Sequence, residues 1–313
     1  MNAIKKLKER FLQYANEVKE ISNFKLFLLY IVSYLRYDCT IKDFFTFKLY
    51  LLNSRGKKLF VTNGYLMKMY KRINKPELAH LLKSKEETFI KYGKWMNRMW
   101  CGVKYNNSLE NYDEFIKNNS KCIVKPLELC AGHGIRIIEL KDYTAEKLQQ
   151  ECLKNNELIE ELIVQHDKMK SLHPDSVNTI RITTEDKKII GVMMRIGAGG
   201  SAVDNACSGG MFAQVDVDNG IVVTNAFNYN GEVFFKHPDT NVTFLGFEIP
   251  MWTECIKLIE EAAEILPEIP IIGFDIAITD NGPVIVEVNE CPDLALLQQP
   301  LTIQLEKRLL VNH

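Results

Sequence analysis

The sequence predicts an α+β protein in which a helical N-terminal region precedes antiparallel strands and further helices. Three observations predict this class. Residues 1–52 have the composition of helices, and short apolar strands joined by tight turns recur after residue 121. The segment Ile271–Asn289 has the pattern of a strongly apolar β-hairpin. With 313 residues, 46% of them hydrophobic, the chain is long enough for two domains or one elaborate domain.

Charge is unevenly distributed along the chain. The net charge is −1, with 39 Lys and Arg against 40 Asp and Glu, but residues 1–75 hold 16 of the basic residues and only 5 of the acidic ones. A basic front region suggests an anionic partner such as lipid or a polyanionic glycan, and a solvated helical face is the simpler alternative. No nucleic acid is expected as a partner, because no recognised nucleic-acid motif accompanies the charge.

The N-terminal region is expected to contain helices over Met1–Glu20, Phe24–Tyr37 and Ile41–Leu52. The second is the most apolar stretch, but it falls short of the roughly 20 residues that span a bilayer. It is either a buried helix or an interfacial helix flanked by Lys25 and Arg36. Eight scattered cysteines without a CxxC motif, and no signal peptide, favour a reducing cytoplasm, with peripheral association at the inner face of the membrane as an extension.

The next segment is predicted to mix strand and helix. Lys57–Thr62 is expected to form a short strand, Pro76–Arg98 a helix that contains Lys85, and Leu109–Asn118 a short helix.

A candidate phosphate-binding loop follows. Cys122–Lys125 and Ile135–Leu140 are expected to pair as strands around a loop that ends in Gly132-His133-Gly134. Glycines let a backbone close over phosphates, and Lys125 can place an ammonium group on the same phosphates. The pattern is neither a Walker A motif nor a dinucleotide-binding fingerprint, and His133 can equally be an exposed loop residue.

Two adjacent acidic residues mark the next strand. After a helix over Thr144–Asn155, the strand Leu158–Gln165 carries Glu160 and Glu161. They can form a hinge that binds adenine through its backbone, although an ordinary strand end has the same appearance.

Two arginines stand within otherwise apolar strands. Arg181 lies in the predicted strand Ser176–Thr184 and Arg195 in the predicted strand Lys188–Ile196, and a glycine-rich loop over Gly197–Gly210 follows. A buried arginine needs an anionic partner, which is either a bound anion or a structural carboxylate. Further elements are expected as a hairpin over Met211–Asp216 and Ile221–Ala226, a helix over Pro250–Ile265 and a last helix over Gln298–Leu310.

The hairpin Ile271–Asn289 carries a candidate metal site. Its turn contains Asn-Gly, which favours a hairpin, and side chains alternate faces along each strand. Glu287 and Asn289 therefore share a face, and Asp275 can face them from the partner strand. Converging carboxylate and amide oxygens suit Mg²⁺, whereas an ordinary hairpin with polar residues at its end is the alternative.

These pieces together resemble the ATP-grasp enzymes, and more closely the branch associated with sugar transfer and surface polysaccharide gene clusters. The resemblance covers about residues 70–300. It rests on Lys85, the Lys125 strand, Glu160-Glu161 and Asp275 with Glu287-x-Asn289, and on the segments HPDSVNTIRI, VDNACSGG and HPDT.

The resemblance implies an ATP-grasp fold of two α+β subdomains that clamp ATP. The implied segments are a basic helical region over 1–55, a pre-grasp segment over 56–120, a first subdomain over 121–163 and a second over 164–313. The implied site residues are Lys85 and Lys125 on the ATP phosphates, Gly132, His133 and Gly134 in the lid, Glu160, Glu161 and Ile163 at the adenine, and Asp275, Glu287 and Asn289 on magnesium.

One departure concerns the arginine that many ATP-grasp ligases carry two residues before the metal-binding Asp. That position is Gly273 here, so Arg181 or Arg195 is expected to stabilise the transferred phosphoryl group.

The resemblance further implies an ADP-forming carboxylate–amine ligase that uses ATP and Mg²⁺. The expected partners are an amine or amino acid and a carboxylated sugar or glycan, joined during synthesis of a capsule or O-antigen. The alternatives are a kinase that phosphorylates a sugar hydroxyl, a peptide ligase, and a nucleotide-binding module without chemistry.

Overall fold

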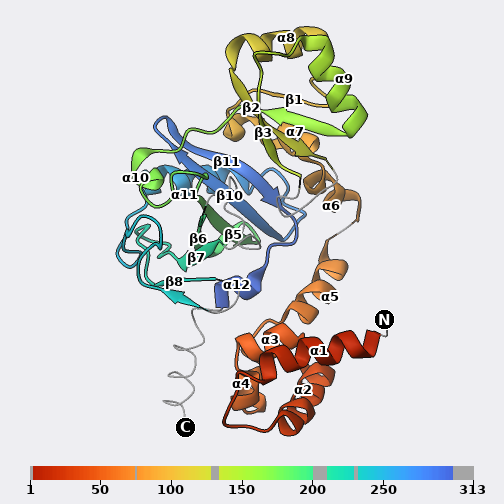
Figure 1. The fold of residues 1–313 in the computed structure, drawn as a ribbon, viewed down its shortest axis with the longest axis vertical. Helices are drawn as coiled ribbons and strands as arrows, with labels where there is room; N and C mark the ends of the chain where they lie inside the picture. Colours follow the sequence, from red (N-terminus) through yellow and green to blue (C-terminus); the bar gives the residue numbers. More distant parts are fainter. Residues whose placement is uncertain (1–2, 75, 128–133, 200–209, 229–231, 299–313) are drawn as a thin grey trace. The chain divides into compact units, whose positions relative to one another are not determined.

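The computed structural model describes residues 3–74, 76–127, 134–199, 210–228 and 232–298. The chain forms two compact units (Figure 1). The first combines Met1–Ile73 with Asp293–His313, and the second is Asn74–Pro292. The four segments expected from the sequence divide the chain at a finer level and stay a prediction. Within the described residues, no helix combines the length and the apolar character needed to cross a membrane.

The first unit is helical in its described part. Its elements are α1 (Ala3–Ala15), α2 (Asn23–Tyr37), α3 (Ile41–Thr46), η1 (Leu49–Leu51), α4 (Ser54–Lys57), α5 (Asn63–Ile73) and α12 (Leu294–Gln298). An aromatic core holds them together, in which Phe11, Tyr30, Phe44 and Phe45 make mutual ring contacts. The helical prediction for this region is confirmed.

The predicted strand over Lys57–Thr62 is wrong. Asn53 accepts a hydrogen bond from the amide of Gly56 at 2.9 Å, and this cap starts the short helix α4 instead. The following residues are irregular, and Phe60 is buried in the aromatic core. Because the described part of this unit contains no other strand, a strand here has no partner with which to pair.

The second unit contains a four-stranded antiparallel sheet. Its strands are β1 (Trp100–Cys101), β4 (Glu157–Glu160), β2 (Lys121–Pro126) and β3 (Arg136–Glu139), in that order across the sheet. Helices α8 (Leu109–Asn118) and α9 (Ala145–Asn155) cover it, as seen at the top of Figure 1. Tyr112, Phe115 and Leu148 are fully buried between these helices and the sheet. The strand predicted over Leu158–Gln165 ends already at Glu160, because the chain then leaves this sheet.

A seven-stranded sheet completes the second unit. Its order is β11-β10-β5-β6-β7-β8-β9, with every pair antiparallel. The strands are β5 (Thr179–Glu185), β6 (Lys188–Ile196), β7 (Met211–Gln214), β8 (Ala226–Phe227), β9 (Val233–Phe234), β10 (Ile271–Thr279) and β11 (Gly282–Asn289). The short helix α10 (Asp167–Lys170) precedes β5 in sequence, and the short helix α6 (Pro76–Lys83) contacts β11. The predicted hairpin over Ile271–Asn289 and the α+β class are therefore confirmed. The strand predicted over Ile221–Ala226 is wrong, because this segment pairs with the one before it only through the isolated bridge between Val215 and Val222.

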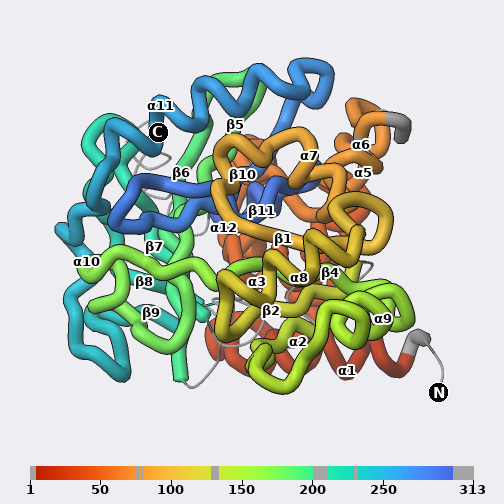
Figure 2. The backbone as a smooth tube through the Cα atoms, turned by 90° about the horizontal axis from the view of Figure 1, so that it is seen from above, coloured from red at the N-terminus to blue at the C-terminus, as the bar shows by residue number. Residues whose placement is uncertain are grey.

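One face of this larger sheet is apolar and carries helices. Ile180, Ile182, Met194, Phe274 and Ile276 are fully buried there. Helix α11 (Trp252–Ala262) contributes to the same core, and α7 (Lys85–Met96) lies along β11 (Figure 2). The opposite face carries polar side chains, among them Arg181 and Asp275.

The helix predicted over Pro76–Arg98 is two helices. The side chain of Ser84 caps α7 by accepting a hydrogen bond from the amide of Glu87 at 3.3 Å. Lys85 is consequently the first residue of α7 and not an interior residue. Of the last predicted helix, only Gln298 lies within the described residues, at the end of α12.

Candidate active site

Strand register brings the predicted metal and arginine residues to one face of the larger sheet. Asp275 on β10 pairs with Glu287 on one side and with Arg181 on the other, and Gly273 pairs with Asn289. Directly paired residues point to the same face. The polar side chains thus gather opposite the apolar face.

A β-bulge in β11 sets the direction of Glu287. The register between β10 and β11 shifts after Asp275, so that Val286 is the extra residue between Ile285 and Glu287. Without it, Ile285 and Glu287 would share a face, because they are two residues apart. With it, Ile285 is buried in the core while Glu287 lies on the polar face. Nothing in the alternation pattern predicted this bulge.

Asp275 is a buried carboxylate held by two arginines. Arg181 donates to both of its oxygens, through Nε and through Nη2 at 2.7 Å, and Arg195 donates from Nη1 at 2.8 Å. Burial alone would raise the pKa of Asp275, but the two guanidinium groups outweigh it and hold the pKa below its ordinary value. Asp275 is therefore ionised, and it fixes both arginines in place.

Glu287 and Asn289 have the properties of cation ligands. The pKa of Glu287 is raised, because the surrounding protein partly desolvates its carboxylate and the charge of Asp275 repels it. The Glu287 side chain nevertheless has an exposed surface, so a cation can reach it. The amide nitrogen of Asn289 is buried and has no hydrogen-bond partner among the described residues. A half-turn of the amide places its oxygen there, so the pair fits an oxygen-binding ion such as Mg²⁺.

The fit of Asp275 to the same ion is less direct. Both of its oxygens already accept hydrogen bonds, so a cation would share this carboxylate with Arg181 and Arg195. Among the described residues, no group of three or more His, Cys, Asp or Glu side chains is placed to hold a metal. A magnesium site would consist of Glu287, the Asn289 amide and a shared Asp275, and this set stays a prediction.

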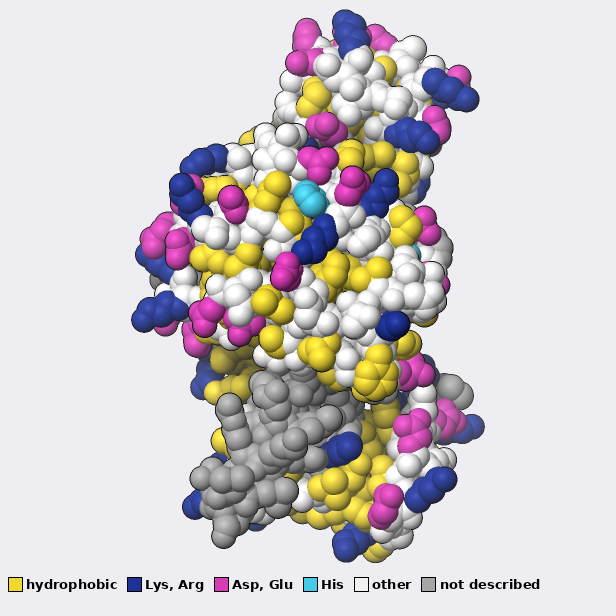
Figure 3. Space-filling view, turned by 90° about the vertical axis from the view of Figure 1, so that its left-hand side faces the viewer, with side chains coloured by type: hydrophobic (Ala, Val, Ile, Leu, Met, Phe, Trp, Pro, Cys, Tyr) yellow, Lys and Arg dark blue, Asp and Glu magenta, His cyan; other side chains and the backbone are white. Residues whose placement is uncertain are grey.

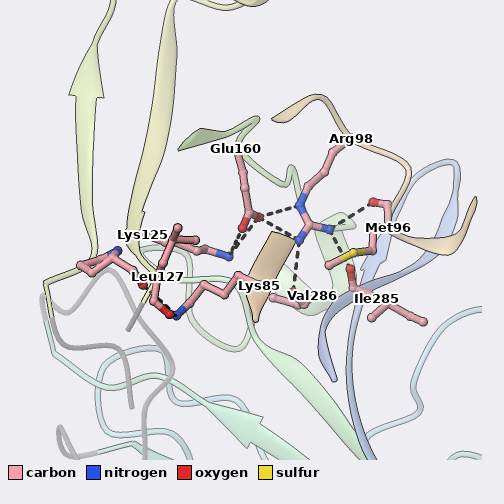
Figure 4. Close-up of polar contacts among 9 residues, drawn as sticks. Lys85, Met96, Arg98, Lys125, Leu127, Glu160, Ile285 and Val286 are labelled. Carbon is pink, nitrogen blue, oxygen red and sulfur yellow. Dashed lines mark hydrogen bonds and ion pairs between the residues drawn. The ribbon is translucent and has the colours of Figure 1, made fainter. Parts of the chain in front are cut away.

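Lys125 belongs to a second charged cluster, shown in Figure 4. Its ammonium group lies 2.9 Å from both carboxylate oxygens of Glu160. Glu160 also accepts a hydrogen bond from Nε of Arg98 at 2.8 Å and forms an ion pair with Nη2 of Arg98 at 2.8 Å. Burial by itself raises the pKa of Glu160, but the charges of Arg98 and Lys125 keep that pKa below its ordinary value. The charge of Lys125 partly offsets the rise in the pKa of Glu287. The cluster around Glu160 and the cluster around Asp275 therefore influence each other electrostatically.

Lys85 lies at the start of the predicted phosphate loop. Its ammonium group donates to the carbonyl oxygens of Pro126 at 2.8 Å and Leu127 at 3.4 Å (Figure 4). Lys85 and Lys125 therefore meet at the end of β2, where the loop begins. Gly132 and His133 lie outside the described residues.

Gly134 is described, and it has a positive φ of 75°. Such a backbone conformation favours glycine because other residues are strained there.

The residues predicted at the adenine lie where β4 ends. Glu161 exchanges backbone and side-chain hydrogen bonds with Met99, at 2.9 and 3.0 Å. The Glu160 carboxylate is occupied by the cations described above. Ile163 lies in the irregular segment 161–166, which runs from β4 to α10. Nucleotide binding by these residues stays a prediction.

The glycine at position 273 makes room for Arg181. A Cβ atom at this position would lie 3.3 Å from Cδ of Arg181 and 2.8 Å from Cβ of Pro292. The arginine expected two residues before Asp275 is thus replaced in space by an arginine from the neighbouring strand β5. That Arg181 or Arg195 takes over the role of this arginine stays a prediction.

Two buried histidines fix the chain just after Arg195. His173 bonds to the carbonyl of Gly199 at 2.8 Å, and His237 bonds to the carbonyl of Gly197 at 2.9 Å. Their rings lie 5.4 Å apart. These residues begin the sequence segments HPDS and HPDT, whose structural role is therefore to hold the backbone that follows β6.

Arg98 is the residue of this site that the sequence analysis missed. Its signal was available, because a single charged residue, Arg98, stands in the largely apolar stretch WMNRMW. A buried cation in such surroundings needs anionic or carbonyl partners.

Comparison with known proteins identifies the family. The sequence profile of the sugar-transfer associated ATP-grasp family matches residues 65–310. The chain belongs to this family. No curated protein matches the chain.

Solved structures of low sequence identity also match. The ATP-grasp ligase PsnB, complexed with a phosphomimetic variant of its minimal precursor, Mg and ADP, is 13% identical with a TM-score of 0.43, over 78% of this chain and 65% of that one. D-alanine–D-alanine ligase from Bacillus anthracis is 17% identical with a TM-score of 0.40, over 74% and 63%. D-cycloserine synthetase DcsG is 13% identical with a TM-score of 0.43, over 76% and 78%. The chain spans less than two thirds of the length of the first two structures.

Proposed function

We propose that this protein is an ADP-forming carboxylate–amine ligase. The observation that carries the proposal is the convergence of Arg181 and Arg195 with Asp275 and Glu287 on neighbouring strands of the larger sheet. Transfer of a phosphoryl group needs positioning and positive charge more than it needs a nucleophilic side chain. The family assignment supports ATP as the donor.

The proposed reaction has two steps. A carboxylate oxygen of the acceptor attacks the γ-phosphorus of ATP, which releases ADP and leaves an acyl phosphate. An amine then attacks the acyl carbon, phosphate departs, and the amine nitrogen loses a proton. Bound magnesium would supply neutralisation of phosphate charge beside Glu287 and Asn289.

The chain's own cations have distinct parts in this reaction. Lys85 and Lys125 bind the phosphates at the end of β2, and Arg181 and Arg195 stabilise the phosphoryl group during transfer. Asp275 holds the two arginines in a fixed geometry, so that little reorganisation is needed as charge develops.

The family description, which associates these proteins with sugar transfer, supports a sugar-linked substrate. We propose that the acid is a uronic acid of a surface polysaccharide such as a capsule or an O-antigen, and that the amine is an amino acid or a small amine. A kinase acting on a sugar hydroxyl uses the same phosphate site but stops after the first transfer.

Product mass separates these functions. The full-length protein is incubated with MgATP, uronic-acid sugars and a mixture of amino acids and amines, and ADP release is followed together with product mass. The ligase gives a product equal to acid plus amine minus water. A gain of one phosphoryl group identifies a kinase, and absence of ATP binding overturns both functions.

Glu287→Gln is the matched loss-of-function variant in this assay. It removes a charge that would hold magnesium, so turnover is expected to fall at least about 100-fold, the effect of losing one strong stabilising interaction. Glu264→Gln, on the exposed surface, is the control and is expected to keep turnover. Equal turnover in both variants would contradict the assignment of Glu287.

We further propose that the first unit binds the inner membrane surface through α2. Phe24, Leu28, Ile31 and Leu35 are exposed by 73, 50, 37 and 73%. Their spacing of four, three and four residues places them in one stripe along the helix. The opposite side of α2 is buried in the aromatic core. Figure 3 shows hydrophobic side chains at the surface of this unit with Lys and Arg nearby.

The charge of the region favours anionic lipid as the occupant of this surface. Residues 1–75 hold 16 basic and 5 acidic residues, and the basic side chains of α1 are exposed. Cations beside an apolar helical face are typical of interfacial helices. Such docking would place the enzyme next to lipid-linked glycans on the side where ATP is present.

Vesicle sedimentation tests the surface. Wild type is expected to sediment with vesicles of anionic lipid and to remain free with neutral lipid. The double variant Leu28→Glu/Leu35→Glu is expected to lose this binding, whereas Val164→Glu, at another exposed apolar residue, keeps it. If the double variant sediments with anionic vesicles as wild type does, α2 is not the membrane-binding surface. If wild type dimerises and the double variant does not, a second copy of the chain covers this surface instead.

A further inference from the structure

Arg98 connects the two sheets of the second unit. Its guanidinium group donates to the Glu160 carboxylate on β4, at 2.8 Å, and to the carbonyl oxygens of Ile285 at 2.7 Å and Val286 at 3.1 Å on β11. A further hydrogen bond reaches the carbonyl of Met96 at 3.1 Å. Figure 4 shows these contacts around a single side chain, which is only 3% exposed.

The contacts of Arg98 on β11 fall on the bulge. Val286 is the extra residue that turns Glu287 to the polar face, and Arg98 binds its carbonyl and that of the residue before it. A bulge leaves ladder groups unpaired, and buried carbonyl groups need donors. The guanidinium group therefore stabilises the bend that aims Glu287.

The contact of Arg98 with Glu160 on β4 affects the position of Lys125. Glu160 is shared between the cations of Arg98 and Lys125. If Arg98 were absent, the whole charge of Glu160 would attract Lys125 and draw its ammonium group away from a bound phosphate. Sharing the carboxylate leaves Lys125 held in position but able to bind a second anion.

We propose that Arg98 is a positioning residue that sets Lys125 and Glu287 relative to each other, so that one polyphosphate can meet both. This inference rests on the proposed function, because it assumes that the site binds ATP. The contacts of Arg98 are made with Glu160 and with backbone carbonyl groups, so it acts through these neighbours. The Phe89 ring lies 4.9 Å from the guanidinium carbon, which fixes the plane of the group.

Nucleotide binding distinguishes positioning from general stability. Calorimetric titration of the full-length protein compares MgATP with AMP for wild type, Arg98→Met, Lys125→Met and the double variant. Arg98→Met is expected to reduce the preference for MgATP over AMP by about 10-fold or more, the scale of one charged hydrogen bond, with little change for AMP. The loss in the double variant is expected to be smaller than the sum of the two single losses, because Arg98 and Lys125 share the carboxylate of Glu160.

Arg136→Met is the matched control. Arg136 also joins two strands of the smaller sheet through a carboxylate, with bonds of 2.5 and 2.7 Å to Glu157, but it does not contact Lys125 or β11 within the described residues. It is expected to keep the preference for MgATP. An equal loss of preference in Arg136→Met and Arg98→Met would overturn the inference.

Hydrogen exchange tests the contact with β11 separately. Arg98→Met is expected to speed amide exchange at residues 285–289 more than in the turn between β5 and β6. If this variant does not fold, Arg98→Lys retains a cation for Glu160 but lacks the fork that reaches both carbonyls, and the same local increase is expected. Unchanged exchange in the folded variant contradicts the role of Arg98 at the bulge.

The outcomes separate the two hypotheses. Wild type that does not bind MgATP contradicts the proposed function. Wild type that binds MgATP, together with an Arg98→Met variant of unchanged nucleotide preference, contradicts only the role of Arg98.

Discussion

At the scale of single residues, the space over Gly273 is filled by Arg181 and Pro292. Arg181 crosses this position from β5, and its Cδ atom would be 3.3 Å from an added Cβ. Pro292 is closer still, at 2.8 Å, and its ring has little freedom to move. A side chain at residue 273 therefore competes directly with the arginine that holds Asp275.

We expect Gly273→Ala to destabilise the protein by about 1–3 kcal/mol, the usual cost of overfilling a packed site. The free energy of urea unfolding measures this change. Gly93→Ala is the control, because a Cβ at this exposed position of α7 has no neighbour within 4 Å. It should instead stabilise the helix by about 0.5–1 kcal/mol. Equal effects of the two substitutions would contradict the packing at residue 273.

The sequence predicted the residues of the hairpin better than it predicted Arg98. Asp275, Glu287 and Asn289 are near one another in sequence, and strand alternation suffices to place Glu287 and Asn289 on one face, whereas their approach to Asp275 also needs the bulge. The partners of Arg98 are 62 residues away at Glu160 and 187 residues away at Ile285. No local pattern encodes contacts of that separation, so only the charge in an apolar stretch pointed to them.

At the scale of elements, strand ends were predicted less well than strand existence. The strand expected to reach Gln165 ends at Glu160, where Glu161 turns back to the Met99 backbone. The bulge at Val286 was not predicted either. Both features depend on neighbouring strands and buried partners, whereas apolar periodicity reports only that a strand exists.

The smaller sheet should show a measurable acid dependence through Glu157. Its hydrogen bonds to Arg136 hold its pKa below the ordinary value of 4.5. As the pH falls, Glu157 therefore takes up a proton in the unfolded chain before it does so in the folded protein. The stability that its ion pair with Arg136 contributes is complete above about pH 4.5 and is lost as the pH falls toward the pKa of Glu157 in the folded protein.

The difference in unfolding free energy between wild type and Arg136→Met should therefore be constant above about pH 5 and shrink at lower pH. Urea unfolding from about pH 3 to about pH 7 measures it. Glu157→Gln should abolish the pH dependence of this difference. A difference that grows as the pH falls would refute the ion pair as its source.

At the scale of the whole molecule, the two units have separate cores. Aromatic residues of α1–α3 fill the first, and the residues of both sheets fill the cores of the second. The ends of the second unit are also joined, because the side chain of Asn74 donates to the carbonyl of Glu290 at 2.7 Å. Composition predicted a helical front region but did not predict that the segment from Asp293 belongs to it.

We therefore expect the fragment Asn74–Pro292 to fold alone and to bind MgATP as tightly as the full chain. Circular dichroism melting and calorimetric titration measure the two properties. The same fragment should fail to sediment with anionic vesicles, since it lacks α2. A fragment that folds but binds no nucleotide, while the full chain does, would show that the first unit contributes to the site.

The bulge in β11 has a consequence for association between molecules. β11 is an edge strand, and a regular edge offers a row of free backbone groups on which another chain can add a strand. Here Val286 interrupts the row, and Arg98 occupies two of the carbonyl oxygens. The feature that aims Glu287 thus also protects the sheet from growing by aggregation.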